Sequence, residues 1–221
     1  MTTAPTEEFS FRAIYSRTGA GIYFSHLDTM KALIRAIRRS GLPYKLTHGF
    51  HVRPKVCLGP PLPLGHASQY EIIDFFLDKK IPISEIRESL SPQMPQGLKI
   101  LEITEISSES KMNWNNSRVR YRFVFHDSDK KISLLIKEFF SNSHRLIDSK
   151  KASGAKQYPL GNFFQIIGTQ EADHETSSII IDFQQGQPNS PSASKIINAL
   201  LNFLGEAGYN IDLIERIAIF P

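Results

Sequence analysis

Basic side chains gathered in one stretch give this sequence its clearest chemical potential. Residues 29–70 contain seven Lys or Arg and no Asp or Glu, whereas the rest of the chain holds 19 Lys or Arg against 22 Asp or Glu. The seven are Lys31, Arg35, Arg38, Arg39, Lys45, Arg53 and Lys55. A positive potential concentrated in this way attracts a polyanion such as RNA, or an acidic protein surface. The alternative is a solvated helix face whose counter-charges come from elsewhere in the fold.

Arginine and aromatic residues in this stretch suit the recognition of phosphates and bases. The planar guanidinium of Arg binds phosphate or carboxylate, and aromatic rings stack on nucleic-acid bases. We therefore predict an RNA-binding set made of Lys31, Arg35, Arg38, Arg39, Tyr44, Phe50, Arg53 and Lys55. Two structural alternatives remain: Phe50 fills a gap in the core, and Arg39 pairs with an acid such as Glu71.

Histidines in and beside this stretch are candidates for catalysis or metal binding. His26 or His51 could act as a general acid or base, because an imidazole titrates near neutral pH. His26, His48 and His51, together with Asp28, could also bind a transition metal. The simpler interpretation places His26 at the start of a helix and leaves His51 exposed to solvent. We assign no metal site and no cofactor, and whether these histidines bind a metal stays open.

A single cysteine, Cys57, restricts the redox chemistry of the chain. One thiol cannot form an internal disulfide or hold an iron–sulfur cluster, so a reducing, cytoplasmic setting is expected. Cys57 falls on an expected strand, where packing in the core is its expected role. The first ten residues lack the basic region of a secretory signal, and no apolar run approaches the roughly 20 residues of a membrane helix.

The first half of the chain is expected to fold as β-α-β-β-α-β. Residues 25–40 have helical spacing of apolar side chains, with Ser25 as the N-cap and Gly41 as the stop signal. The other expected elements are strands at 9–15, 44–48, 55–58, 70–77 and 98–106 and a helix at 83–90. The Gly- and Pro-rich residues 59–65 are expected to form a stiff loop that holds residues 49–54 against the first helix.

The second half is expected to repeat the same order of elements. They are strands at 117–126, 146–148, 163–168, 177–183 and 215–220 and helices at 130–140 and 192–204. Residues 150–156 form an expected lysine-containing loop, and the polar residues 107–116 an expected linker. The halves share this order but no detectable sequence similarity. The expected fold class is α+β, with two tandem ferredoxin-like units that have antiparallel sheets, in domains at 1–107 and 117–221.

Four short stretches of the first half resemble the radical-SAM-linked family of unknown function. They are Ser25-His26-Leu27-Asp28, Arg38-Arg39-Ser40-Gly41-Leu42-Pro43, Gly49-Phe50-His51-Val52-Arg53-Pro54-Lys55 and Leu62-Pro63-Leu64-Gly65. In the family these stretches read approximately SHLD, RRAGLP, GFNPRPK and LPLG. His51-Val52 and Ser40 depart from that pattern without removing a charged group. Members occur either as the C-terminal part of radical SAM proteins or as separate chains.

The resemblance implies an accessory role beside a radical SAM enzyme, in RNA or ribosome-related modification. It implies no known reaction. This chain has no Cys-x3-Cys-x2-Cys motif, so a partner polypeptide would hold the cluster that radical chemistry requires.

Three functions follow from these residues. The leading hypothesis is a non-catalytic module that binds tRNA or rRNA and works with a radical SAM partner. The second is a metal-independent endonuclease similar to those that process CRISPR repeat RNA. In that reading, His26 or His51 is the general base, and Arg38 or Lys55 steadies the transition state. The third is a domain that only docks onto an acidic protein surface.

Overall fold

The computed structural model describes residues 8–48, 50–107, 117–126, 131–151, 154–161, 163–171, 176–185 and 191–220. These residues form two compact units, unit 1 within 1–112 and unit 2 within 113–221. Both units combine helices with antiparallel sheets, so the expected α+β class with antiparallel sheets is confirmed. No helix in the described ranges is both long and apolar enough to span a membrane.

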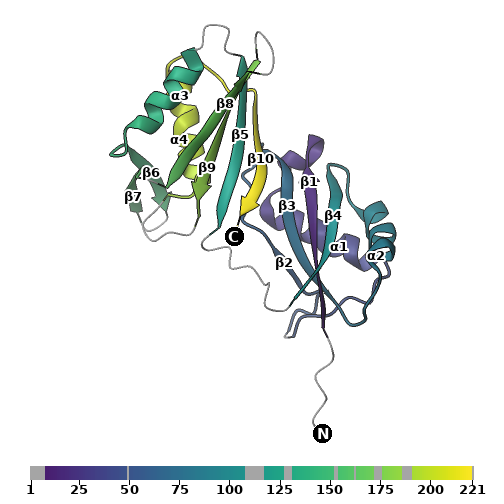
Figure 1. Ribbon diagram of the computed structural model, residues 1–221. Coiled ribbons are helices and arrows are strands. Elements are labelled where there is room, and N and C mark those ends of the chain that lie inside the picture. Colours follow the sequence, from purple (N-terminus) through teal and green to yellow (C-terminus); the bar gives the residue numbers. More distant parts are fainter. Residues whose placement is uncertain are drawn as a thin grey trace. The chain divides into compact units, whose positions relative to one another are not determined.

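Unit 1 has one four-stranded antiparallel sheet in the order β4-β1-β3-β2. Its elements are β1 (Phe9–Arg17), the 3₁₀ helix η1 (Gly19–Tyr23), α1 (His26–Arg39), β2 (Val56–Leu58), β3 (Ala67–Leu77), α2 (Ile83–Leu90), the 3₁₀ helix η2 (Ser91–Gln93) and β4 (Leu98–Ile106). Both α-helices pack on one face of the sheet (Figure 1).

Alternating residues of the strands build the core of unit 1. Phe11, Ala13 and Tyr15 of β1 point to the same face because side chains alternate along a strand. They pack with Ile73 and Phe75 of β3, and the rings of Phe11 and Phe75 stack at 5.7 Å between centroids. The helices complete the cluster with Leu33, Ala36, Ile37, Ile86 and Leu90. This burial holds α1 firmly against the sheet and leaves its other side to solvent.

Unit 2 has a four-stranded antiparallel sheet in the order β10-β5-β9-β8 and a separate hairpin. Its elements are β5 (Arg118–His126), α3 (Lys131–Ser141), β6 (Leu146–Lys151), β7 (Gly154–Pro159), β8 (Phe164–Glu171), β9 (Thr176–Gln184), α4 (Ala193–Glu206) and β10 (Leu213–Phe220). The prediction of a loop at 150–156 was wrong over most of its length, because β6 and β7 pair as an antiparallel hairpin.

Each unit contains an equivalent ion pair with a buried carboxylate. It joins the strand that comes first in the sequence of that unit to the strand beside it in the sheet. In unit 1, Arg12 of β1 binds Asp74 of β3 through Nε–Oδ1 and Nη2–Oδ2 contacts of 2.7 and 2.8 Å. In unit 2, Arg120 of β5 binds Asp182 of β9 through the corresponding contacts of 2.7 and 3.0 Å. The partners are 62 residues apart in both units.

The short sequence around each aspartate is also repeated. Residues 72–75 and residues 180–183 both read Ile-Ile-Asp-Phe. The statement that the halves share no sequence similarity was therefore wrong at this site.

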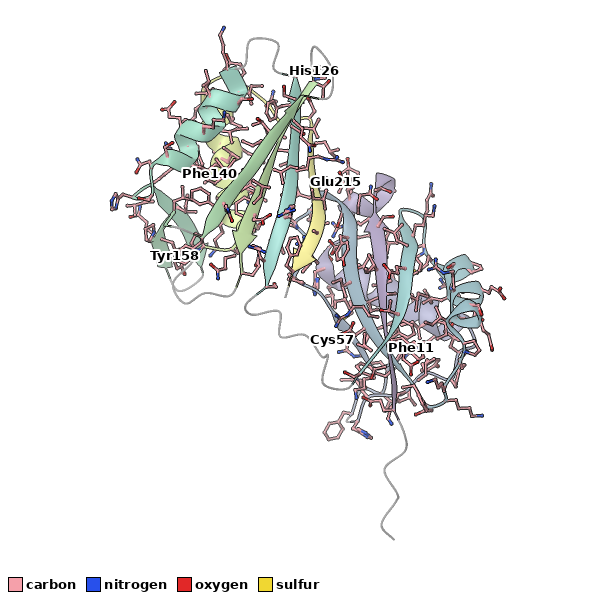
Figure 2. The ribbon with its side chains drawn as sticks, in the orientation of Figure 1. Phe11, Cys57, His126, Phe140, Tyr158 and Glu215 are labelled. Carbon is pink, nitrogen blue, oxygen red and sulfur yellow. The ribbon has the colours of Figure 1, made fainter. Side chains whose placement is uncertain are left out.

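Two further expectations concern Cys57 and the linker between the two halves. Cys57 is exposed on β2, so its expected burial was wrong (Figure 2). A three-residue strand at the edge of a sheet has a side that nothing covers. The expected linker at 107–116 lies outside the described residues, apart from Ser107.

Candidate nucleic-acid interface of unit 1

Helix α1 begins at the expected cap. The Ser25 hydroxyl oxygen accepts a hydrogen bond from the backbone N–H of Asp28 at 3.1 Å, and the hydroxyl donates to the Asp28 carboxylate at 2.5 Å. The hydrogen bond from Ser25 lowers the pKa of Asp28, with a smaller contribution from nearby Lys31. The first turn of α1 is thus fixed by a charged capping pair, which sets the orientation of the helix face that follows.

One side of α1 presents three cations to solvent. Lys31, Arg35 and Arg38 are exposed, and residues four and seven positions apart lie on the same side of a helix. None of the three forms a hydrogen bond or an ion pair with another residue in the described part of the chain. The opposite side of α1 is buried through Thr29, Leu33, Ile34, Ala36 and Ile37. These cations therefore stand on a rigid element and remain available to a ligand.

Residues 45–48 and 50–55 form two arms that are joined at the base of a loop. The backbone N–H of Lys55 donates to the carbonyl of Lys45 at 2.7 Å, and Leu46 and Pro54 form an isolated β-bridge. Glu8 lies between the two lysines, 2.5 Å from Lys55 Nζ and 4.0 Å from Lys45 Nζ. The base of this loop is therefore held by backbone pairing and by one shared carboxylate.

The tip of the same loop is apolar and exposed. The side chain of Phe50 is fully exposed, and the side chain of Val52 is 55% exposed. The interpretation of Phe50 as a core plug was therefore wrong. Thr47 fixes the tip, because its backbone N–H donates to the Arg53 carbonyl at 2.8 Å and its hydroxyl oxygen accepts from the Arg53 N–H at 3.2 Å. The ring of Phe50 therefore has no packing role in the core of unit 1.

Arg53 brings the loop onto helix α1. Its Nη1 atom lies 3.9 Å from the sulfur of Met30, which directly precedes Lys31. Arg38 lies eight residues further along α1, which is about 12 Å along the axis and about 80° around it from Met30. Arg53 therefore lies against α1 at Met30, which is about 80–100° around the helix from Lys31 and Arg38. We call Lys31, Arg35, Arg38, Arg53 and Phe50 the α1–loop surface.

The Gly- and Pro-rich residues 59–65 are held by a buried arginine that sequence reasoning missed. Arg17 is 2% exposed and donates from Nε to the Gly21 carbonyl and from Nη2 to the Ile22 carbonyl, both at 2.8 Å. It also reaches the Pro63 carbonyl at 3.4 Å. The N–H of Gly65 donates to Ile22 as well, at 2.9 Å. Arg17 therefore ties the loop to η1, directly before α1, and its place beside a Gly-rich turn was the only sequence signal.

Three residues of the predicted RNA-binding set have partners inside unit 1. Arg39 donates to the Gln93 carbonyl at 2.6 Å rather than to Glu71. Lys55 is bound to Glu8 and lies 4.4 Å from the ring centre of Phe76. Tyr44 packs against the core. The remaining five residues of that set make up the α1–loop surface.

The histidines are not gathered into a site. His26, His48 and His51 are all exposed. Within the described ranges, no three His, Cys, Asp or Glu side chains lie close enough together to hold a metal ion. The imidazoles of His48 and His51 have no hydrogen-bond partner among the described residues that would orient them for proton transfer.

Comparison with known proteins identifies the family of this chain, and the description of that family names no activity. A family model described as an uncharacterized protein conserved in bacteria (DUF2344) matches residues 10–192, and the chain belongs to this family. No curated protein matches the chain.

Solved structures offer only remote similarity. The heme complex of a variant of DypB from Rhodococcus jostii RHA1 is 11% identical, with 99% of this chain and 94% of that chain covered, at a TM-score of 0.25. A second crystal form of that enzyme is also 11% identical, with 99% and 93% covered, at a TM-score of 0.23. Scores this low carry no argument about fold or function.

Proposed function

We propose that this protein is a non-catalytic RNA-binding module and that the α1–loop surface of unit 1 contacts the RNA. The observation that carries the proposal is the row of three exposed cations on one side of α1, joined by the exposed Arg53, which contacts Met30 of the same helix, and by the fully exposed ring of Phe50 three residues before Arg53. The cations supply attraction for the phosphate backbone, and the ring supplies a platform for an unpaired base.

The charge pattern favours a polyanion over a single small ligand. Lys31, Arg35 and Arg38 are spread over two turns of α1, about 10 Å, and Arg53 adds a fourth charge beside Met30. A row of separated cations matches phosphates that repeat along a strand. None of these side chains forms an ion pair within 4.0 Å among the described residues, although Asp28 lies near Lys31, so binding a phosphate breaks no close ion pair.

The exposed ring favours single-stranded RNA or a loop over a regular duplex. Stacking on an aromatic ring requires a base that has left its own stack, and such bases occur in loops, bulges and ends. An exposed phenyl ring is costly to keep in water. A base-stacking role accounts for the exposure of the Phe50 ring.

The family resemblance supports a role beside a radical SAM enzyme. The residues of the α1–loop surface fall within or next to the four stretches that carry this resemblance. Under this proposal the partner enzyme carries out the chemistry, and this chain binds or presents the RNA substrate.

We also propose that both units are ferredoxin-like. The order β4-β1-β3-β2 in unit 1 and the order β10-β5-β9-β8 in unit 2 support this assignment. Unit 2 then differs by the insertion of the β6–β7 hairpin between its first helix and its second core strand.

Binding of labelled tRNA and rRNA fragments at several salt concentrations tests the RNA proposal. With four phosphate contacts, the logarithm of the association constant should fall with the logarithm of salt concentration at a slope of about −3. Failure to bind any RNA at low salt contradicts the proposal and leaves the docking function. Cleavage of RNA by the wild type, lost in His26→Ala or His51→Ala, replaces it with the nuclease function.

Purification of the chain from its own cells tests the accessory role separately. We expect a radical SAM protein and RNA to be recovered together, and nuclease treatment to release the RNA. Recovery of RNA without a radical SAM protein retains RNA binding and removes the partnership.

A further inference from the structure

Unit 2 contains a separate pocket at the junction of α3, α4 and β6. Its volume is about 360 Å³, which lies in the range of small-molecule sites. Polar and charged side chains line much of it: Arg145, Lys195, Asn198, Asn202 and Glu206. The remaining lining residues are Phe139, Leu146, Ile147, Ala199 and Phe203. None of these residues belongs to the α1–loop surface.

Arg145 lies on an aromatic platform at this pocket. Its guanidinium carbon is 4.7 Å from the ring centre of Phe139 in α3 and 4.7 Å from that of Phe203 in α4. The two rings are themselves 5.5 Å apart, so they support one guanidinium side by side. Contact with aromatic rings holds a planar cation in one orientation without using its N–H donors.

The guanidinium of Arg145 has no polar partner in the described part of unit 2. Its Nε atom is buried and makes no hydrogen bond, and the guanidinium forms no ion pair with a described residue. Buried donors in folded proteins are almost always hydrogen-bonded. A charged group held in place, lining a pocket and lacking an acceptor, is what an anion-binding site requires.

Helix α4 supplies the rest of the polar lining from one side. Asn198 follows Lys195 by three residues, and Asn202 follows Asn198 by four. Residues with this spacing lie along one stripe of a helix. Lys195 lies 5.0 Å from the ring centre of Tyr158, a β7 residue (Figure 2), and has no ion pair with a described residue. Glu206 lies on the same stripe, about 16 Å from Lys195 along the helix axis. The Lys195 end of the pocket therefore carries positive charge.

We propose that this pocket binds a small phosphate monoester. Arg145 and the side-chain amide of Asn202 bind the phosphate beside Phe203. Lys195 and the side-chain amide of Asn198, which lie toward the start of α4, bind hydroxyl groups of the attached body. Glu206, about one turn beyond Asn202, accepts a hydrogen bond from a hydroxyl group. The proposal is independent of RNA binding by unit 1, although the 5′-terminal phosphate of an RNA has the same chemistry as a free phosphate monoester.

Calorimetric titration of the full chain with ribose 5-phosphate, ribose and inorganic phosphate tests the site. We expect ribose 5-phosphate to bind at least tenfold more tightly than ribose, and inorganic phosphate to compete with it. Arg145→Gln should weaken ribose 5-phosphate at least tenfold, whereas Lys137→Gln on the exposed side of α3 should leave it unchanged. A 5′-phosphorylated oligonucleotide that outcompetes ribose 5-phosphate identifies RNA ends as the source of the phosphate.

A second variant keeps the test decisive if Arg145→Gln does not fold. Asn202 is exposed on α4, so Asn202→Asp should fold while it places a negative charge beside the proposed phosphate position. Weakening of ribose 5-phosphate by at least tenfold supports the site. Unchanged affinity in both variants, or no difference between ribose and ribose 5-phosphate, overturns it.

Discussion

Unit 1 and unit 2 place the same buried ion pair in the same position and differ in what surrounds it. Arg12–Asp74 and Arg120–Asp182 each join the first strand to a central strand, with carboxylate side chains that are 3% and 1% exposed. Unit 1 adds a loop that carries an exposed aromatic ring and contacts the cation-bearing helix α1 through Arg53. Unit 2 adds a hairpin and a polar pocket. The ion pair is therefore part of the scaffold that both units have, whereas the candidate binding features differ from one unit to the other.

The scaffold pair is the place where a substitution should have the largest effect. Asp74→Asn and Asp182→Asn each leave a guanidinium without its counter-charge in a mostly buried position, and we expect a loss of about 3 kcal/mol in the free energy of unfolding. Asp182→Asn also removes the counter-charge of Arg118, whose Nε lies 3.5 Å from the Asp182 carboxylate, so the two losses should be similar although Arg120 is more exposed than Arg12. Urea unfolding followed by fluorescence measures both.

A matched control uses an ion pair at the surface. Lys80 and Glu105 are 3.2 Å apart and well exposed, so Glu105→Gln should change the stability by less than about 1 kcal/mol. Equal losses in all three variants would contradict a scaffold role for the buried pairs.

Position 17 provides the next test, because unit 1 has a buried arginine there and unit 2 has a phenylalanine at the corresponding position. Arg17 stands 108 residues before Phe125, the same offset that relates the two buried pairs, and Phe125 is fully buried. Arg17→Met should lower the free energy of unfolding by about 2 kcal/mol, since carbonyls of residues 21, 22 and 63 lose a charged donor. Hydrogen exchange should speed up at the Gly65 amide. Protection there equal to that of the wild type contradicts the assigned role of Arg17.

The loop tip should affect binding without affecting stability. Phe50→Ser removes a ring that packs against nothing, so the midpoint of thermal unfolding should not fall. RNA affinity should drop by about 1–2 kcal/mol, the range for loss of one stacked base. Anisotropy titrations with single-stranded RNA measure it, and Leu134→Ser, which alters another exposed apolar side chain, is the control. A lower midpoint together with unchanged affinity would assign Phe50 to folding.

The smallest expected effect is a change in the titration of Asp28. Its folded pKa is below the usual value, so its contribution to stability is fully present above the ordinary carboxyl range and is lost as the pH falls through the folded pKa. Ser25→Ala removes the main cause and should raise the pKa of Asp28 toward that of an unperturbed carboxyl. Titration of its carboxyl carbon by NMR measures the change, and an unaltered titration excludes the cap as the cause.

Local signals made helix α1 predictable from the sequence. Ser25 and Gly41 mark its ends, and the helix occupies residues 26–39 within the expected 25–40. The exposure of Lys31, Arg35 and Arg38 follows from helical spacing alone.

Contacts between distant residues could not be predicted in the same way. The Arg12–Asp74 pair spans 62 residues, and only the strand register brings its members together. Arg17 was missed because the Gly-rich turn beside it does not by itself show that a strand arginine is buried. Lys55 looked available because its partner, Glu8, lies 47 residues earlier in the sequence. Sequence patterns show which charges exist, whereas the fold determines which of them are already paired.

Removal of two cations from the α1–loop surface tests the central proposal most directly. The Arg38→Gln/Arg53→Gln double variant should bind RNA at least tenfold more weakly and reduce the magnitude of the salt slope by about 1.5. Lys79→Gln/Lys99→Gln, which removes the same charge from exposed positions elsewhere in unit 1, should retain both values of the wild type. Equal losses of affinity and slope in the two double variants would contradict RNA binding at this surface.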